Sequence, residues 1–227
     1  MNDCIEKEIE NFFVYREDKK LQSMMVAGYS CDIKEATANY IDTILNMPLD
    51  RIVHHIKNLK REPITAADVF QFSDFDDATT NLCSIIKCDS NKGLNYLETG
   101  KLLLGNKIQR KDGAYRKYGE NHIKMATSIG LAFKFNDIYY LSPLGCVFDE
   151  LDTETRDKLL LRLLLRNKLV SQLLSEALRK SFDMEAYLYD LSKSTYIRRR
   201  TNIKYVISII NRSTEYDFIS ITQNILY

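Results

Sequence analysis

The sequence predicts a mainly α protein built from winged helix-turn-helix units with small β-hairpin wings. Three observations support this fold class. Apolar residues recur at helical spacing over most of the chain. All eight glycines and all three prolines lie at or before Gly145, so residues 146–227 should be mostly helix. Residues 111–145 show two short helical patterns followed by two alternating, strand-like patterns.

Three consecutive regions are expected along the chain. Residues 1–62 form an N-terminal helical region, interrupted at Pro48 and ended by Pro63. Residues 63–150 form a first winged-helix domain, which begins with a helix pair that Thr65 caps. Residues 151–227 combine a long helix with a second winged-helix-like domain.

The first domain contains the clearest helix-turn-helix pattern. Gly119 permits the left-handed backbone that closes one helix and starts a tight turn. Asn121 then caps a helix over residues 121–129 that faces outward with polar groups and would read base edges. The hairpin follows, with Asn136 and Asp137 at its tip.

The outward side chains of this region and its basic neighbours are the predicted DNA contacts. Lysine and arginine suit phosphates or guanine, and short polar groups suit base edges. The predicted contacts are Arg110, Lys111, Arg116, Lys117, Asn121, His122, Lys124, Thr127, Ser128 and Lys134.

A second basic helix is expected from about Thr195 to Ile210, followed by a strand-like ending over residues 216–227. Three consecutive arginines lie about 100° apart around a helix, so they cannot all face one groove and one of them should pack or pair internally. The second set of predicted contacts is Arg198, Arg199, Arg200, Thr201, Asn202 and Lys204.

The long helix between these regions spans residues 154–180 and is rich in leucine. Its wide apolar arc fits a core helix or a brace between domains. It also fits a homodimer interface, so both alternatives remain open.

Charge is clustered in the chain although the net charge is only +1. Residues 101–134 hold eight lysines or arginines against two acids, and residues 193–212 hold six against none. Because phosphate binding depends on clustered cations, this distribution predicts double-stranded DNA as the partner.

Two motifs resemble a known class of proteins. The segment TYIRRRTNIKYVISII is similar to an ending found in the DNA-reading parts of type II restriction endonucleases and in related helix-turn-helix proteins of defence islands. The segments SIGLAF and YYLSPLG resemble the hairpin of the same proteins. The resemblance implies tandem winged helices that bind the target duplex while another domain or subunit cuts it. It marks Arg199, Arg200 and Thr201 as DNA-facing or scaffold residues.

No catalytic set is evident, so a cofactor is not expected, and Mg²⁺ would be needed only by a nuclease. The sequence has no apolar run that could cross a membrane and no secretory signal, which favours a cytoplasmic location. The five cysteines are expected to be reduced thiols. One alternative function is a complete or partial restriction endonuclease that cleaves DNA itself or through a nuclease partner. Another is a winged-helix interaction adaptor or transcriptional regulator.

Overall fold

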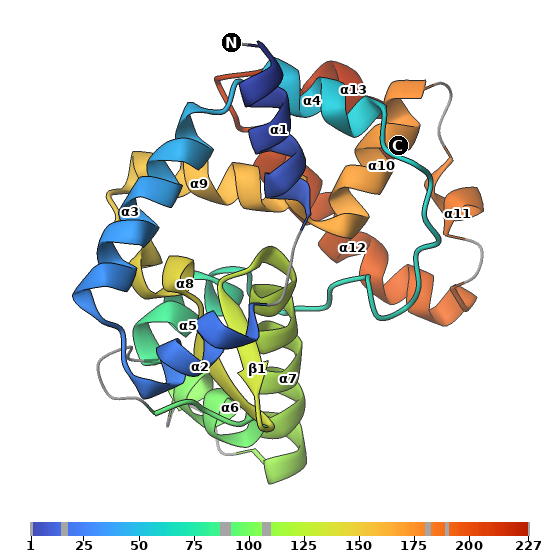
Figure 1. Ribbon diagram of the computed structural model, residues 1–227. Coiled ribbons are helices and arrows are strands. Elements are labelled where there is room, and N and C mark those ends of the chain that lie inside the picture. Colours follow the sequence, from blue (N-terminus) through green and yellow to red (C-terminus); the bar gives the residue numbers. More distant parts are fainter. Residues whose placement is uncertain are drawn as a thin grey trace. The chain divides into compact units, whose positions relative to one another are not determined.

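The chain is mainly helical, as the sequence predicts (Figure 1). The computed structural model describes residues 2–14, 18–86, 92–105, 110–179, 183–188 and 191–226. Within these ranges the only sheet is a two-stranded antiparallel hairpin.

The contacts within the chain define two compact units. Unit 1 comprises Met1–Arg16, Thr43–Phe70 and Asp157–Tyr227, and unit 2 comprises Glu17–Asp42 and Gln71–Arg156. The units are interleaved along the chain, whereas the sequence predicted consecutive regions. The reason is that residues 17–42 contribute apolar side chains to the core of unit 2.

The secondary-structure elements of unit 1 are all helices in its described residues. Its elements are α1 (Asn2–Phe13), the end of α3 (Cys31–Asn46), α4 (Leu49–Lys57), most of α9 (Thr153–Arg166), α10 (Lys168–Arg179), α11 (Met184–Tyr187), α12 (Lys193–Ile210) and α13 (Ile219–Leu226). Helix α10 packs against α4 and α13, and α12 packs against α13.

The predicted single helix over residues 154–180 is instead two helices, α9 and α10. Asn167 separates them, because its Oδ1 accepts hydrogen bonds from the N–H groups of Leu169 at 3.0 Å and Val170 at 3.3 Å. This contact caps the second helix. The leucines from Leu159 to Leu165 are all buried within the chain. They therefore act as core residues, which agrees with the alternative of a core helix.

The predicted strand-like ending is helix α13. Asp217 accepts hydrogen bonds from the N–H groups of Ile219 and Ser220 and so starts the helix. Phe218, Thr222 and Ile225 are buried at helical spacing. The sequence prediction mistook this stripe for alternation. No strand therefore follows α12 in the described part of the chain, and the predicted second winged helix has no wing there.

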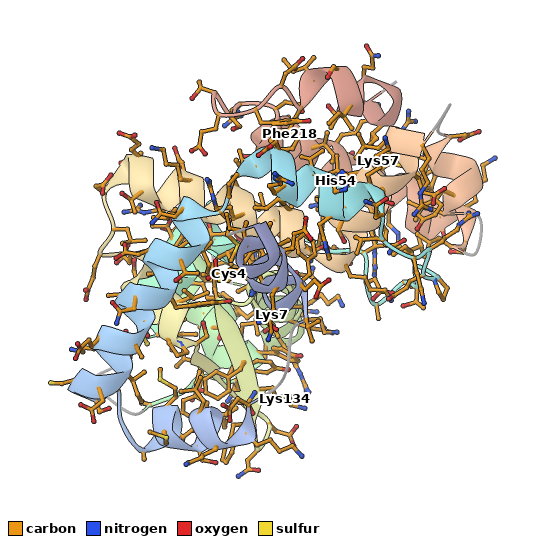
Figure 2. The ribbon with its side chains drawn as sticks, turned by 45° about the horizontal axis from the view of Figure 1, so that its top comes forward. Cys4, Lys7, His54, Lys57, Lys134 and Phe218 are labelled. Carbon is orange, nitrogen blue, oxygen red and sulfur yellow. The ribbon has the colours of Figure 1, made fainter. Side chains whose placement is uncertain are left out.

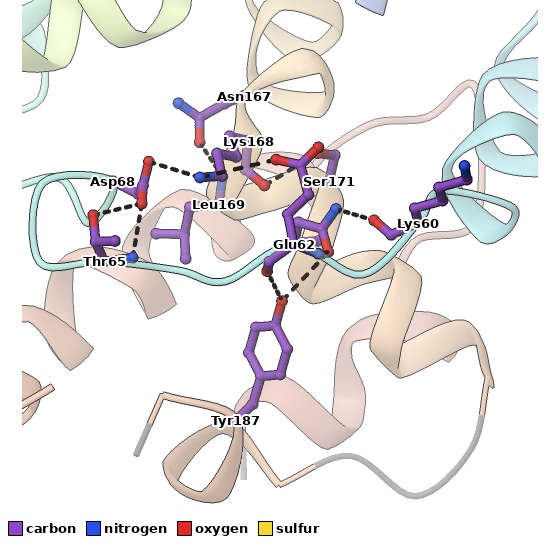
Figure 3. Close-up of polar contacts among 10 residues, drawn as sticks. Lys60, Glu62, Thr65, Asp68, Asn167, Lys168, Leu169, Ser171 and Tyr187 are labelled. Atoms are coloured by element: carbon purple, nitrogen blue, oxygen red, sulfur yellow. Dashed lines mark hydrogen bonds and ion pairs between the residues drawn. The ribbon is translucent and has the colours of Figure 1, made fainter. Parts of the chain in front are cut away.

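The segment between α4 and Asp76 is an extended loop, so the first helix of the predicted pair is absent, whereas α5 (Thr80–Ile85) corresponds to the second. The expected capping contact exists, since Asp68 Oδ2 accepts hydrogen bonds from Thr65 N–H and Oγ1–H, both at 2.7 Å. No helix begins at Thr65, because polar contacts bind the loop to α10 (Figure 3). Lys168 lies 3.3 Å from Asp68, and Gln172 binds the Lys60 carbonyl at 2.9 Å.

An arginine lies in the interior of unit 1. Arg162 is 3% exposed. Its guanidinium donates to Glu215 at 2.8 Å and to the Leu45 carbonyl at 3.1 Å. A buried charge is tolerated only when it is paired and hydrogen-bonded, and this pairing joins α9 to the chain before α4 and to the segment before α13.

Unit 2 holds the hairpin and the helices around it. Its elements are α2 (Lys19–Ala27), most of α3, the 3-10 turn η1 (Asp76–Ala78), α5 (Thr80–Ile85), α6 (Tyr96–Leu104), α7 (Asp112–Ile129), β1 (Ala132–Phe135), β2 (Ile138–Leu141) and α8 (Pro143–Phe148). Met25, Ile33 and Phe133 form one of its core clusters. The expectation of reduced cysteines is wrong at Cys146, which is disulfide-bonded.

The predicted hairpin and its tip are confirmed. Strand β1 pairs with β2, and Ala132 lies opposite Leu141. Asn136 and Asp137 have positive φ angles of 48° and 63°, which a tight two-residue turn between twisted strands requires. Leu94, just before α6, adds a short bridge to Tyr139 through two backbone hydrogen bonds of 2.9 and 3.0 Å.

Candidate nucleic-acid interface

Helix α7 is continuous from Asp112 to Ile129, so the predicted turn at Gly119 is wrong. A Cβ atom at Gly119 would lie 2.0 Å from the Tyr96 carbonyl oxygen and 2.7 Å from the Gly100 nitrogen. A Cβ atom at Gly100 would lie 1.9 Å from the Tyr115 carbonyl oxygen. The two glycines thus permit close backbone contact between α6 and α7, a use of glycine that requires no positive φ angle.

Tyr118 fixes α7 to the polar segment around η1. Its hydroxyl donates to Asp77 Oδ2 at 2.5 Å, and Asn81 donates to the other carboxylate oxygen at 2.6 Å. Desolvation and then the bond to Asp77 raise the pKa of Tyr118. The tyrosine therefore remains neutral and donates a hydrogen bond to the Asp77 carboxylate, which is itself buried.

His122 points into unit 2, which corrects its prediction as an outward base contact. Its side chain is fully buried. Nδ1 lies 2.7 Å from the Tyr118 carbonyl, and Nε2 accepts the Asp74 N–H at 3.3 Å. Because a carbonyl only accepts, Nδ1 carries the proton and the ring is neutral. Burial lowers the pKa of His122, although the Tyr118 carbonyl and the nearby aspartates oppose this effect.

This histidine should make folding sensitive to acid. The unfolded ring has a pKa of about 6.5, and the folded ring has a lower one. As the pH falls below about 6.5, the unfolded state therefore binds the proton first and the free energy of unfolding decreases. His122→Gln should flatten this decrease in urea denaturation at pH 7.5 and 5.5, whereas His54→Gln, at an exposed position, should not. Equal acid sensitivity in the wild type and both variants would contradict the assignment of His122 as a buried neutral ring.

The outward face of α7 is basic, with one carboxylate at its centre. Arg116, Lys117 and Lys124 are exposed. Glu120 accepts hydrogen bonds from Lys124 at 2.6 Å and from Lys117 at 3.0 Å. The bond from Lys124, followed by that from Lys117, lowers the pKa of Glu120 against an opposing effect of desolvation. The carboxylate therefore stays ionised between two lysines.

The remaining predicted residues of α7 differ in accessibility. Asn121 is half-buried and lies beside Glu120. Ser128 is exposed and donates to the Met125 carbonyl at 2.7 Å. Thr127 is half-buried, and its hydroxyl oxygen is enclosed without a hydrogen-bond partner among the residues described. The prediction that the Thr127 hydroxyl faces outward is therefore wrong.

A hollow of about 690 Å³ lies between the start of α6, helix α7 and the hairpin. Its cationic lining residues are Arg116 and Lys134. Lys134 projects from the hairpin (Figure 2) and lies 2.6 Å from Asp137. Tyr96 and Tyr139 complete one wall, where their hydroxyls are hydrogen-bonded and their rings stack at 4.9 Å. The hairpin thus brings Lys134 to the same hollow as Arg116.

Two further predicted contacts precede α7. Arg110 and Lys111 are both exposed. The Arg110 N–H donates to the Tyr115 hydroxyl at 3.3 Å, and Lys111 is the residue before the first turn of α7. Both side chains therefore lie at the amino end of the basic face.

The second set of predicted contacts lies on α12, in unit 1. Arg199 donates hydrogen bonds to the carbonyls of Ala66 and Val69, the latter at 2.7 Å, and desolvation lowers its pKa. It therefore packs against the loop after α4, which agrees with the scaffold role given as the alternative to a DNA-facing one. The positions of the others are mixed. Arg198 and Thr201 are exposed, and Arg200, Asn202 and Lys204 are half-buried.

The sequence prediction missed three side chains of the site. Glu120 was overlooked because an acid on a basic helix reads as ordinary surface charge. A helical wheel drawn over the continuous α7 places it between Lys117 and Lys124. Tyr96 and Tyr139 had no local signal, since they are 43 residues apart in the sequence.

Comparisons with protein-family models, with curated proteins and with solved structures each found no match. None of the helices in the described ranges has both the length and the hydrophobicity of a membrane span. The same residues contain no group of three or more histidine, cysteine or acidic side chains arranged to hold a metal ion.

Proposed function

We propose that this protein binds double-stranded DNA through unit 2, as a winged helix-turn-helix in which α7 enters the major groove. The observation that carries the proposal is the combination of element order and charge. Helix α5, the bridge at Leu94, helices α6 and α7 and the hairpin follow one another in the chain. Arg116, Lys117 and Lys124 of the last helix and Lys134 of the hairpin are exposed cations.

The geometry suits a groove. Helix α7 has 18 residues and is therefore about 27 Å long. Its exposed side chains lie on one face opposite a fully packed one. A major groove about 12 Å wide admits such a helix. The hollow between α7 and the hairpin, with Arg116 and Lys134 in its lining, suits a backbone phosphate.

The test is fluorescence anisotropy with a labelled duplex at about 50 and 200 mM salt. Binding should weaken as salt rises, because each neutralised phosphate contributes about 0.9 to the slope of the logarithmic plot. Arg116→Ala should weaken binding to all sequences and reduce that slope by about 1. Lys20→Ala removes an exposed cation of α2 and should leave both unchanged.

No binding at low salt, or binding without a salt slope, would contradict the proposal. An added arm with Mg²⁺ tests the restriction endonuclease alternative, because cleaved duplex would place a nuclease in this chain. A stable protein complex in the absence of DNA affinity would favour an adaptor.

A further inference from the structure

A carboxylate at the centre of a DNA-binding face requires an explanation. Glu120 lies between Lys117 and Lys124 and binds both of them. Its side chain is 24% exposed, whereas those of the two lysines are 58% and 62% exposed. The carboxylate is thus partly sheltered and held in place by two cations.

Electrostatics alone would disfavour this residue at the interface. DNA carries one negative charge per about 1.7 Å of helix axis, so a carboxylate on the approaching helix is repelled. It also neutralises lysines that would otherwise bind phosphates without regard to sequence. A residue with these two effects lowers the affinity for every duplex unless it also makes a favourable contact with a base.

The major groove offers such a group. Cytosine presents its N4 amino group there as a donor, and glutamate accepts from it, whereas guanine and thymine present acceptors that repel a carboxylate. Resting on the DNA-binding function proposed above, we propose that Glu120 is a specificity-determining residue that accepts a hydrogen bond from the N4 amino group of cytosine in the major groove.

The experiment is a selection of bound duplexes from a random-sequence library, followed by sequencing. The wild-type pool should be enriched in cytosine at one position by about 5- to 160-fold, the range that one good base contact provides. Glu120→Gln should move the preference at that position toward adenine, because glutamine pairs with adenine N6 and N7. It should also tighten binding to random duplex and steepen the salt slope, since Lys117 and Lys124 are released.

The matched control is Glu35→Gln, which removes one exposed carboxylate from α3, and it should behave as the wild type does. Thermal unfolding of each variant checks that Glu120→Gln remains folded. If the wild type and Glu120→Gln select the same sequences, or if the wild-type position is adenine, the inference is overturned while DNA binding stands. If the wild type binds no duplex at any salt concentration, both proposals fail.

Discussion

Replacing Gly119 with alanine should lower the free energy of unfolding of unit 2 by up to about 2 kcal/mol. Alanine gains about 1 kcal/mol over glycine inside a helix. Overpacking, however, costs typically about 1–3 kcal/mol, and here the new Cβ would meet backbone atoms at 2.0 and 2.7 Å. Backbone cannot move aside as a flexible side chain does, so α6 and α7 must separate. Urea denaturation followed by circular dichroism measures the loss.

Gly113 provides a matched control in the same helix. A Cβ atom there meets nothing within 4 Å, so Gly113→Ala should stabilise the protein by up to about 1 kcal/mol. Opposite signs for the two substitutions would support the close helix crossing. A stabilising effect at both positions would show that α6 and α7 are further apart than described.

Replacing Arg162 with alanine should have the largest effect on unit 1. The change leaves Glu215 without its 2.8 Å partner and the Leu45 carbonyl without a donor at 3.1 Å. The Glu215 side chain is itself 30% exposed, so the loss comes from the charge-assisted hydrogen bonds of the buried guanidinium, which contribute about 1.5–3 kcal/mol. We expect a loss in that range by urea denaturation, with a Tm lowered accordingly.

Two variants test the cause of this loss. Arg198→Ala removes an exposed arginine of α12 and should change stability by less than about 0.5 kcal/mol. Arg162→Met combined with Glu215→Gln removes both charges and should recover much of the lost stability, because methionine fills the buried position without a charge that needs a partner. Additive losses in the double variant would contradict a coupled pair.

Local sequence signals predicted the hairpin correctly and the helix before it incorrectly. Asn136 and Asp137 have one common use between two alternating segments, namely a tight turn. Glycine has two uses, positive φ and close packing. At Gly119 the neighbouring Asn121 led to the prediction of a positive φ angle. The close contact with α6 shows that the glycine serves packing instead. That contact joins residues distant in sequence and leaves no local trace.

The error at Gly119 also explains the errors among the predicted contacts. In a continuous α7, the buried stripe runs through Tyr115, Gly119, His122 and Ala126, which places His122 inside. A histidine on that stripe looks polar and outward until its partners, Tyr118 O and Asp74 N–H, are known. Arg199 is a parallel case, since the carbonyls that it binds belong to a loop about 130 residues away.

The interleaving of the two units bears on how the chain folds during synthesis. Unit 2 needs nothing beyond Arg156, so all of its residues are available while the last part of the chain is still being made. Unit 1 includes Met1–Arg16 but also needs Asp157–Tyr227. Helices α1 and α4 therefore cannot complete their packing until α10 and α13 have been made. Because domains generally fold as units as the chain emerges, we expect unit 2 to be formed first, with the apolar faces of α1 and α4 left uncovered until residues 157–227 have been made.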